Sequence, residues 1–272
     1  MPHEDLTRDA ILQALTDALQ PLPFVHALYE GGAASRGRLD PWSDLDVYAL
    51  VDDDRVPEAL AAIEGALARL SPIKQKYEVK HPPSDGMAQA FYRLERASEY
   101  LLVDLAVLKV SAPDRSLVPD IHGPAVVHFD KTHATAPPPL DADAHVKRLL
   151  ERLERLRART DMFSVFVQKE INRRNWIEAV DLYRVLVLDA LLEVLRMRHG
   201  PLHFDFKTRY VHSELPPDVV RRYVDLAFVK DPTDLQAKFR EASDWFRQVA
   251  GEIDEAEIRK RIASSQDARI RL

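Results

Sequence analysis

The chain has 272 residues, of which 46% are hydrophobic and 30% charged, and its 38 basic and 44 acidic side chains give a formal net charge of -6. This composition is typical of a globular protein and excludes a disordered chain, and the length allows two domains of ordinary size. The lack of cysteine excludes disulfides, thiolate zinc sites and cysteine nucleophiles, and the acidic balance disfavours a nucleic-acid partner.

No membrane partner is expected either. The N-terminal residues lack the basic region followed by an apolar run that marks a signal peptide. The most apolar helical stretch, 185–195, contains Asp189 and Glu193 and is too short to span a bilayer. We therefore expect a cytoplasmic protein.

Hydrophobic periodicity predicts a first half of mixed helix and strand and a second half of helix alone. Helices and strands of the first half are expected over 6–19, 24–29, 44–51, 57–70, 73–80, 87–94 and 100–110. Helices of the second half are expected over 144–159, 162–173, 176–199, 217–229 and 233–250. The stretch 130–141, with three consecutive prolines, is interpreted as a linker. The pattern thus predicts an α/β (α+β) domain with a mixed sheet over 1–135 and an all-α helical bundle over 140–272.

Two carboxylates two residues apart open the predicted strand 44–51. Side chains at i and i+2 of a strand share a face, so Asp44 and Asp46 lie close enough to repel each other unless a cation or a proton lies between them. Hard oxygen ligands of this kind suit Mg²⁺, which completes its shell with water and substrate phosphates. Asp104, in the predicted strand 100–110, supplies a third carboxylate if its strand lies beside the first.

A turn of small residues precedes these carboxylates. Gly31 and Gly32 offer backbone amides without side-chain obstruction, which can cradle a triphosphate, and Arg36 adds positive charge. A phosphate cradle beside a metal-binding pair fits metal-assisted displacement at the α-phosphorus of a nucleoside triphosphate.

These residues resemble a known signature. The stretch 32–37 followed by Ser43-Asp44-Leu45-Asp46-Val47 is similar to the motif of the nucleotidyltransferase superfamily, which is Gly-Ser, a short loop, Asp-x-Asp or Asp-x-Glu opening a strand, and a carboxylate on a later strand. The resemblance covers about 24–110. The helical half is similar, in general layout only, to that of the aminoglycoside and lincosamide nucleotidyltransferases. One position departs from the motif, since Ala33 stands where the family usually has serine.

The resemblance implies roles for individual residues. Asp44, Asp46 and Asp104 would bind two Mg²⁺ ions, with Asp104 alternatively acting as the base. The nucleotide, expected to be ATP, would be bound by Gly31, Gly32, Ser35, Arg36 and Ser43. The reaction would move a nucleoside monophosphate, expected to be AMP, to a hydroxyl of a small molecule. An aminoglycoside-like antibiotic is the favoured acceptor, and antibiotic resistance the corresponding role.

The helical half offers further candidates. Lys207 and Arg209, in the aromatic and basic segment 203–212, are expected to reach the phosphates. Candidates for binding the acceptor or acting as base are Glu170, Glu178 and Asp181, although each also fits a solvated helix face. Two alternatives remain open: a nucleotide-binding protein without catalysis, and a nucleotidyltransferase that modifies a protein partner.

Overall fold

The computed structural model describes residues 6–113, 115–137 and 139–270. The chain divides into two compact units, Met1–Pro139 and Leu140–Leu272. The first five residues, to which the signal-peptide argument refers, and Pro138 of the predicted linker lie outside the described residues. No helix among the described residues is both long enough and apolar enough to cross a membrane.

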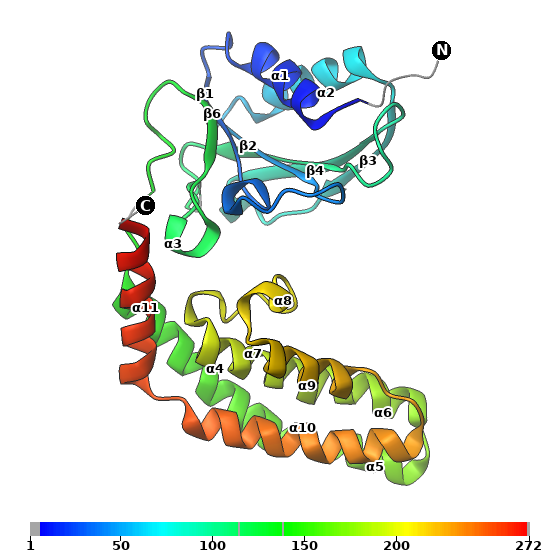
Figure 1. Ribbon diagram of the computed structural model, residues 1–272. Helices are drawn as coiled ribbons and strands as arrows, with labels where there is room; N and C mark the ends of the chain where they lie inside the picture. Colours follow the sequence, from blue (N-terminus) through cyan, green and yellow to red (C-terminus); the bar gives the residue numbers. More distant parts are fainter. Residues whose placement is uncertain (1–5, 114, 138, 271–272) are drawn as a thin grey trace. The chain divides into compact units, whose positions relative to one another are not determined.

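Within the described residues of the first unit, six strands form one sheet in the order β3-β4-β5-β2-β1-β6 (Figure 1). The strands are β1 Val25–Glu30, β2 Leu45–Val51, β3 Ile73–Val79, β4 Met87–Leu94, β5 Val103–Lys109 and β6 Val126–Asp130. The central neighbours β2 and β5 are parallel and the other pairs are antiparallel. The predicted mixed sheet is therefore confirmed.

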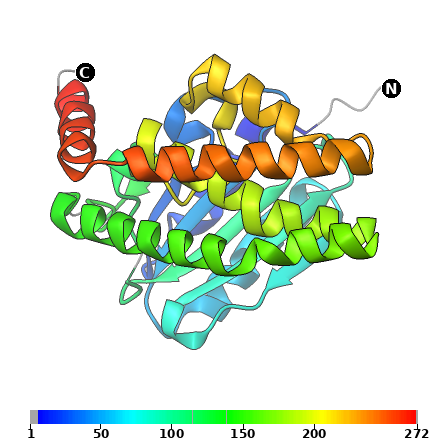
Figure 2. The ribbon, with the colours of Figure 1, turned by 90° about the horizontal axis from the view of Figure 1, so that it is seen from below.

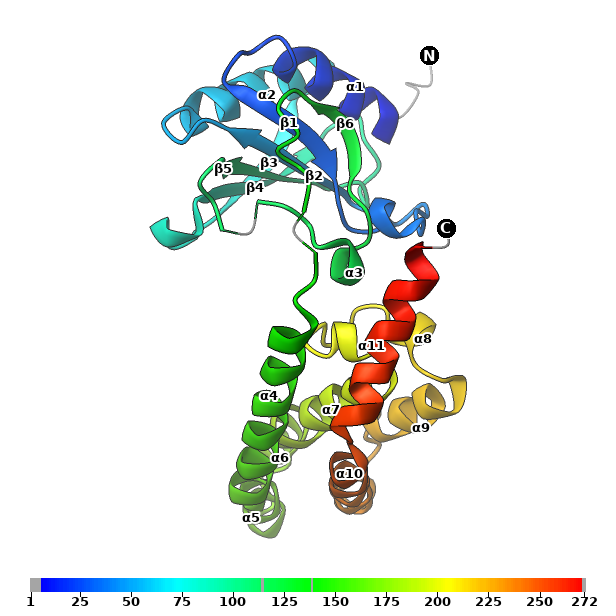
Figure 3. The same ribbon diagram turned by 90° about the vertical axis from the view of Figure 1, so that its left-hand side faces the viewer.

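Two helices, α1 (Arg8–Leu19) and α2 (Val56–Leu70), cover one face of this sheet (Figures 1 and 3). Ile11 of α1 and Ile63 of α2 are fully buried against alternate residues of β2, such as Val47. Because side chains alternate along a strand, the residues between them, Asp46 and Tyr48, point to the opposite face. The face without α1 and α2 therefore carries the polar groups of the central strands.

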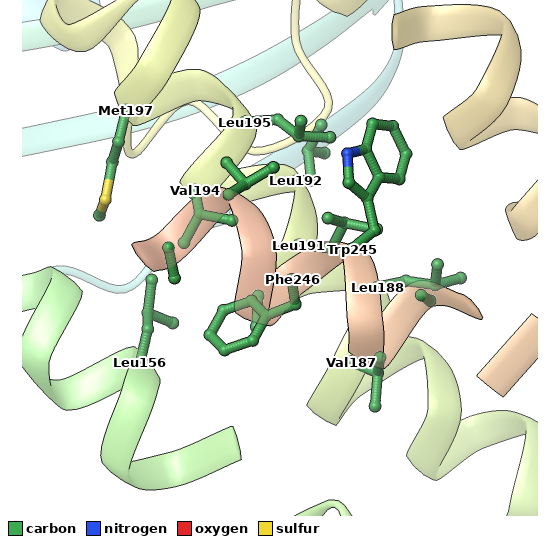
Figure 4. Close-up of a cluster of buried hydrophobic side chains, with 14 of the residues drawn as sticks. Leu156, Val187, Leu188, Leu191, Leu192, Val194, Leu195, Met197, Trp245 and Phe246 are labelled. Atoms are coloured by element: carbon green, nitrogen blue, oxygen red, sulfur yellow. The ribbon is translucent and has the colours of Figure 1, made fainter. Parts of the chain in front are cut away.

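The second unit is helical. Its elements are α4 Ala142–Phe163, α5 Val165–Arg173, α6 Trp176–Tyr183, a π-helical segment Arg184–Leu188, α7 Asp189–His199, α8 Val211–Glu214, α9 Pro217–Ala227, α10 Pro232–Glu252 and α11 Glu255–Ile270. The long helices α4 and α10 run alongside each other (Figure 2). Figure 4 shows the core between them, where Leu191 and Val194 of α7 gather with Phe246 of α10 and Leu156 of α4. The predicted all-helical second half is confirmed.

Four of the strands and α-helices in the described residues were not predicted: β6, the short helices α3 (Pro119–His122) and α8, and α11. The strand β6 lies at the edge of the sheet, and its Val126 and Val127 are both exposed, so it lacks the alternation that marks a half-buried strand. Of the α11 side chains described, only Ile258 and Ile262 are buried, so α11 has a weak apolar face. The predicted helix 176–199 is also interrupted, since its middle turn is π-helical.

Candidate active site

The two parallel strands at the centre of the sheet each carry one carboxylate on the same face. Asp46 of β2 pairs in register with Asp104 of β5. Strands of a sheet are about 5 Å apart, so the two carboxylates are direct neighbours. Thus β5 occupies the position that a third carboxylate requires, although Asp104 is 58 residues further along the chain (104 − 46).

The charge of Asp104 is disfavoured by its surroundings. Burial, together with the nearby negative charges of Asp46 and Asp44, raises the pKa of Asp104 to about 6, against the opposing effect of a hydrogen bond from Gln89. Removal from water and a like charge both favour the protonated form of a carboxyl group. A cation bound between Asp46 and Asp104 would reverse both effects, so the pair has the electrostatics of a cation site.

A hydrogen-bond chain supports Asp104 from β4. Gln89 Nε2 donates to Asp104 Oδ1 at 2.6 Å, and Gln89 Oε1 lies 2.9 Å from His81 Nε2. Because the Gln89 oxygen can only accept, the proton of this second bond belongs to His81. Neither Gln89 nor His81 could be singled out from the sequence, since neither belongs to the motif and strand order alone brings them to Asp104.

Asp44 differs from its predicted position, because β2 begins at Leu45 and Asp44 is an exposed residue just before the strand. The preceding turn ends at Ser43, whose amide donates to the Asp40 carbonyl at 3.1 Å. Partial burial raises the pKa of the Asp44 carboxyl, while a backbone hydrogen bond at Leu102 opposes that effect. Asp44 is close enough for its charge to act on Asp104.

The backbone of Asp44 is held by a side chain that the sequence did not single out. Arg8, in the first turn of α1, donates from Nη1 to the Asp44 carbonyl at 2.5 Å and from Nη2 to the carboxylate of Glu30. Glu30 is buried at the end of β1 and also contacts His128 Nε2 at 2.8 Å. Although burial opposes it, the bonds from His128 and Arg8 lower the pKa of Glu30. This cluster ties helix, strand and loop together next to the carboxylate pair.

As the side chains stand, no group of three or more histidine, aspartate or glutamate residues in the described parts of the chain has the geometry to hold a metal ion. The metal-binding role of Asp44, Asp46 and Asp104 therefore stays a prediction. What the structure shows is the adjacency of Asp46 and Asp104, with Asp44 at the mouth of the same strand.

The glycine turn packs directly on Asp46. The Gly31 amide donates to the Asp46 carbonyl at 3.1 Å. Gly32 has φ +55°, and a Cβ atom on it would lie 1.8 Å from Asp46 Oδ2. Only glycine fits there, because a side chain would displace the carboxylate and the left-handed backbone is strained for other residues. The candidate phosphate cradle is therefore in direct contact with the candidate cation site.

Other predicted nucleotide ligands have structural contacts. Ser35 is 5% exposed, and its Oγ lies 2.9 Å from the Gly32 carbonyl and 2.6 Å from the His122 carbonyl of α3. Arg36 donates to the carbonyl of Ile121. Ser43 Oγ donates to Asp40 Oδ1 at 2.8 Å. These bonds join the glycine turn to α3 and shape the turn before β2, so nucleotide binding by Ser35, Arg36 and Ser43 stays a prediction that their present contacts do not favour.

The predicted residues of the helical unit are dispersed. Glu170 is buried at the end of α5, where a hydrogen bond from Asn175 and another from Arg173 lower its pKa. A carboxylate so held is a weak base, and the role of Glu170 as base or acceptor ligand stays a prediction. Glu178 and Asp181 are exposed on α6 and stay untested as acceptor ligands.

Lys207 and Arg209 also lie in the second unit. The carbonyls of both accept hydrogen bonds from Arg196, and the Arg209 guanidinium lies over the ring of Phe206, 4.9 Å from its centroid. Their predicted contact with a triphosphate stays a prediction.

Comparison with known proteins adds little to this picture. Neither a protein-family model nor a curated protein sequence matches the chain. A similar solved structure is that of an aminoglycoside 6-adenyltransferase from Bacillus subtilis, which is 11% identical over 96% of this chain and 99% of that chain, with a TM-score of 0.30. At this identity and TM-score the likeness carries no argument about activity, so function has to be argued from the site.

Proposed function

We propose that the chain is a Mg²⁺-dependent nucleotidyltransferase, which moves a nucleoside monophosphate from a triphosphate, with ATP as the expected donor, to a hydroxyl of a small molecule. The observation that carries this proposal is the pair Asp46 and Asp104, side by side on parallel strands beneath the turn of Gly31 and Gly32. Adjacent carboxylates beside a turn without side-chain obstruction are a combination that suits a metal-bound triphosphate.

The donor set fits the metal. Asp46 and Asp104 supply hard oxygen ligands, and the raised pKa of Asp104 is the mark of a carboxyl group whose charge lacks compensation. In the proposed site Asp46 and Asp104 hold Mg²⁺ with help from Asp44. Bound Mg²⁺ neutralises charge on the triphosphate. The glycine turn leaves room for the phosphates beside the carboxylates, and Gln89 fixes the orientation of the Asp104 carboxylate.

The test is pyrophosphate release from each of the four ribonucleoside triphosphates, with Mg²⁺ and a panel of hydroxyl-bearing acceptors that includes aminoglycosides. Asp46→Asn should reduce release on the order of 10³-fold, since loss of a metal ligand costs several kcal/mol of transition-state stabilisation. Asp54→Asn removes a carboxylate from an exposed loop position and is the matched control. Release that is independent of Asp46 would refute the assignment.

A second candidate is a nucleotide-binding protein without catalysis. Ala33 lacks the hydroxyl that the motif usually provides, and Ser35 is tied to backbone carbonyls instead. Nucleotide binding by calorimetry without pyrophosphate release from any acceptor would favour this candidate. Labelled nucleotide that becomes attached to a co-purified protein would point instead to a macromolecular acceptor.

A further inference from the structure

The helical unit carries a stripe of arginines on one face of α4. Arg148, Arg152, Arg155 and Arg159 follow one another at intervals of four, three and four residues, the spacing that places side chains on one helix face. All four line the same cavity, of about 460 Å³. Like charges at this spacing repel one another, so the stripe requires negative charge nearby.

Part of this charge is compensated within the unit. Arg152 makes a bidentate pair with Glu193 of α7, with its Nε 2.6 Å and its Nη2 2.9 Å from the two carboxylate oxygens. Arg148 lies at 3.9 Å from Asp205. The cavity is lined by three carboxylates. Two of them, Glu193 and Asp205, are paired with Arg152 and Arg148, so each neutralises one arginine.

The remaining charges do not balance. Within the described residues, Arg155 and Lys207 make no side-chain hydrogen bond or ion pair, and the only hydrogen bond from the Arg159 side chain goes to the Val185 carbonyl, at 3.4 Å. The third carboxylate, Asp189, begins α7; its side chain has no hydrogen bond or ion pair in the described chain, although the charges of Lys207, Arg184 and Arg159 act on it. Three cations against one carboxylate leave the cavity with an excess of two positive charges.

A second cavity, of about 670 Å³, adjoins the first, and Asp189 and Thr208 line both. Its walls include the aromatic side chains of Trp176, Tyr223 and Phe228, and Phe228 is 71% exposed. The π-helical segment Arg184–Leu188 ends directly before Asp189. Such segments are frequent at functional sites. A basic half and an aromatic half therefore meet at the start of α7.

We propose that these adjoining cavities bind one small molecule that carries an anionic group, a phosphate or sulfonate, next to an apolar ring. Arg155, Arg159 and Lys207 take the anion, and the aromatic wall takes the ring. The binding of such a ligand does not depend on the proposed transferase activity. Its identification as the hydroxyl-bearing acceptor does rest on that activity. An anionic ligand is compatible with the negative net charge of the whole chain, because net charge says little about a single pocket.

The test uses 1-naphthyl phosphate, titrated into the full chain by calorimetry with EDTA and without nucleotide. It should bind more tightly than 1-naphthylmethylamine, which has the same ring with a cation, and than inorganic phosphate, which lacks the ring. Arg155→Gln/Arg159→Gln should weaken binding about tenfold, the effect of losing charge-assisted hydrogen bonds. Phe228→Ser should weaken binding of the naphthyl compound and leave inorganic phosphate unaffected.

A matched control is Lys147→Gln/Arg240→Gln, which removes the same net charge from exposed positions away from both cavities. Equal or tighter binding of the naphthyl cation, or equal weakening by the control pair, would overturn the inference. Because the titration contains EDTA and no nucleotide, Asp46→Asn should leave the binding of 1-naphthyl phosphate unchanged. Binding of 1-naphthyl phosphate without any pyrophosphate release would refute the transferase alone. Pyrophosphate release with no binding of 1-naphthyl phosphate refutes the anionic site alone.

Discussion

Two partly buried carboxylates, one in each unit, have opposite surroundings. In the sheet, burial and the charge of Asp46 raise the pKa of Asp104 to about 6. In the helical unit, burial also acts to raise the pKa of Glu214, but hydrogen bonds from His203 and Arg196 hold it at about 2. Glu214 therefore belongs to a balanced cluster that stabilises the fold. The surroundings of Asp104 disfavour its charge, and carboxyl groups with such a raised pKa are frequent at functional sites.

The strongest way to test the balanced half of this comparison is Arg196→Met. Arg196 is fully buried and donates to Glu214 Oε2 at 2.8 Å and to the Lys207 carbonyl at 2.6 Å. Its removal leaves a buried carboxylate and carbonyls without a donor, so the free energy of unfolding should fall by about 4 kcal/mol. Urea unfolding followed by far-ultraviolet circular dichroism measures it.

The control lies two residues away. Arg198 pairs with Glu252 at the surface, where its side chain is 43% exposed, and Arg198→Met should cost less than about 1 kcal/mol. Similar losses for the two variants would show that the cluster around Glu214 is not a distinct source of stability.

The same contrast explains what could be predicted from sequence. The positions of Asp44 and Asp46 at the opening of a strand follow from a local motif and from hydrophobic periodicity. The adjacency of Asp104 depends on strand order, and the roles of Arg8 and Gln89 depend on side chains that meet across long stretches of chain. Local patterns carry none of this, because strand order is decided by packing over the whole unit.

The arginine stripe of α4 also shows what can and cannot be predicted from sequence. The spacing of Arg152 and Arg155 on α4 is visible in the sequence, and the helix itself was predicted. Only the structure separates Arg152, which is neutralised by Glu193, from Arg155, which is not. A pattern of charges can therefore be predicted, whereas its compensation requires the tertiary contacts.

Gly32→Ala tests the other half of the comparison, with Gly37→Ala as its match. Both glycines have positive φ, +55° and +61°, but a Cβ on Gly32 would meet Asp46 Oδ2 at 1.8 Å, whereas one on Gly37 meets nothing within 4 Å. Both variants should lose about 1 kcal/mol of stability from backbone strain. Gly32→Ala should in addition reduce pyrophosphate release on the order of 10²-fold, because it displaces the carboxylate. Equal rates of pyrophosphate release by the two variants would show that the glycine turn has no part in the reaction.

The smallest expected effect concerns pH. Because the pKa of Asp104 is about 6 in the folded state and near 3.8 when unfolded, the folded state binds more protons between these values, and stability from this group is lost as pH rises through 6. Asp104→Asn should therefore match the wild type at pH 4 and exceed its stability at pH 7.5, by about 1 kcal/mol once solvent screening is allowed for. Thermal unfolding at the two pH values measures the difference.

Magnesium provides the decisive arm of that experiment. If Asp104 helps to hold the cation, Mg²⁺ at pH 7.5 should raise the melting temperature of the wild type and have little effect on Asp104→Asn, since only the charged carboxylate binds it. Asp54→Asn, at an exposed loop position, should respond as the wild type does. If Asp104→Asn is less stable than the wild type at both pH values and responds to Mg²⁺ as the wild type does, then Asp104, like Glu214, is a carboxylate that stabilises the fold. That result would refute the proposed difference between the two clusters.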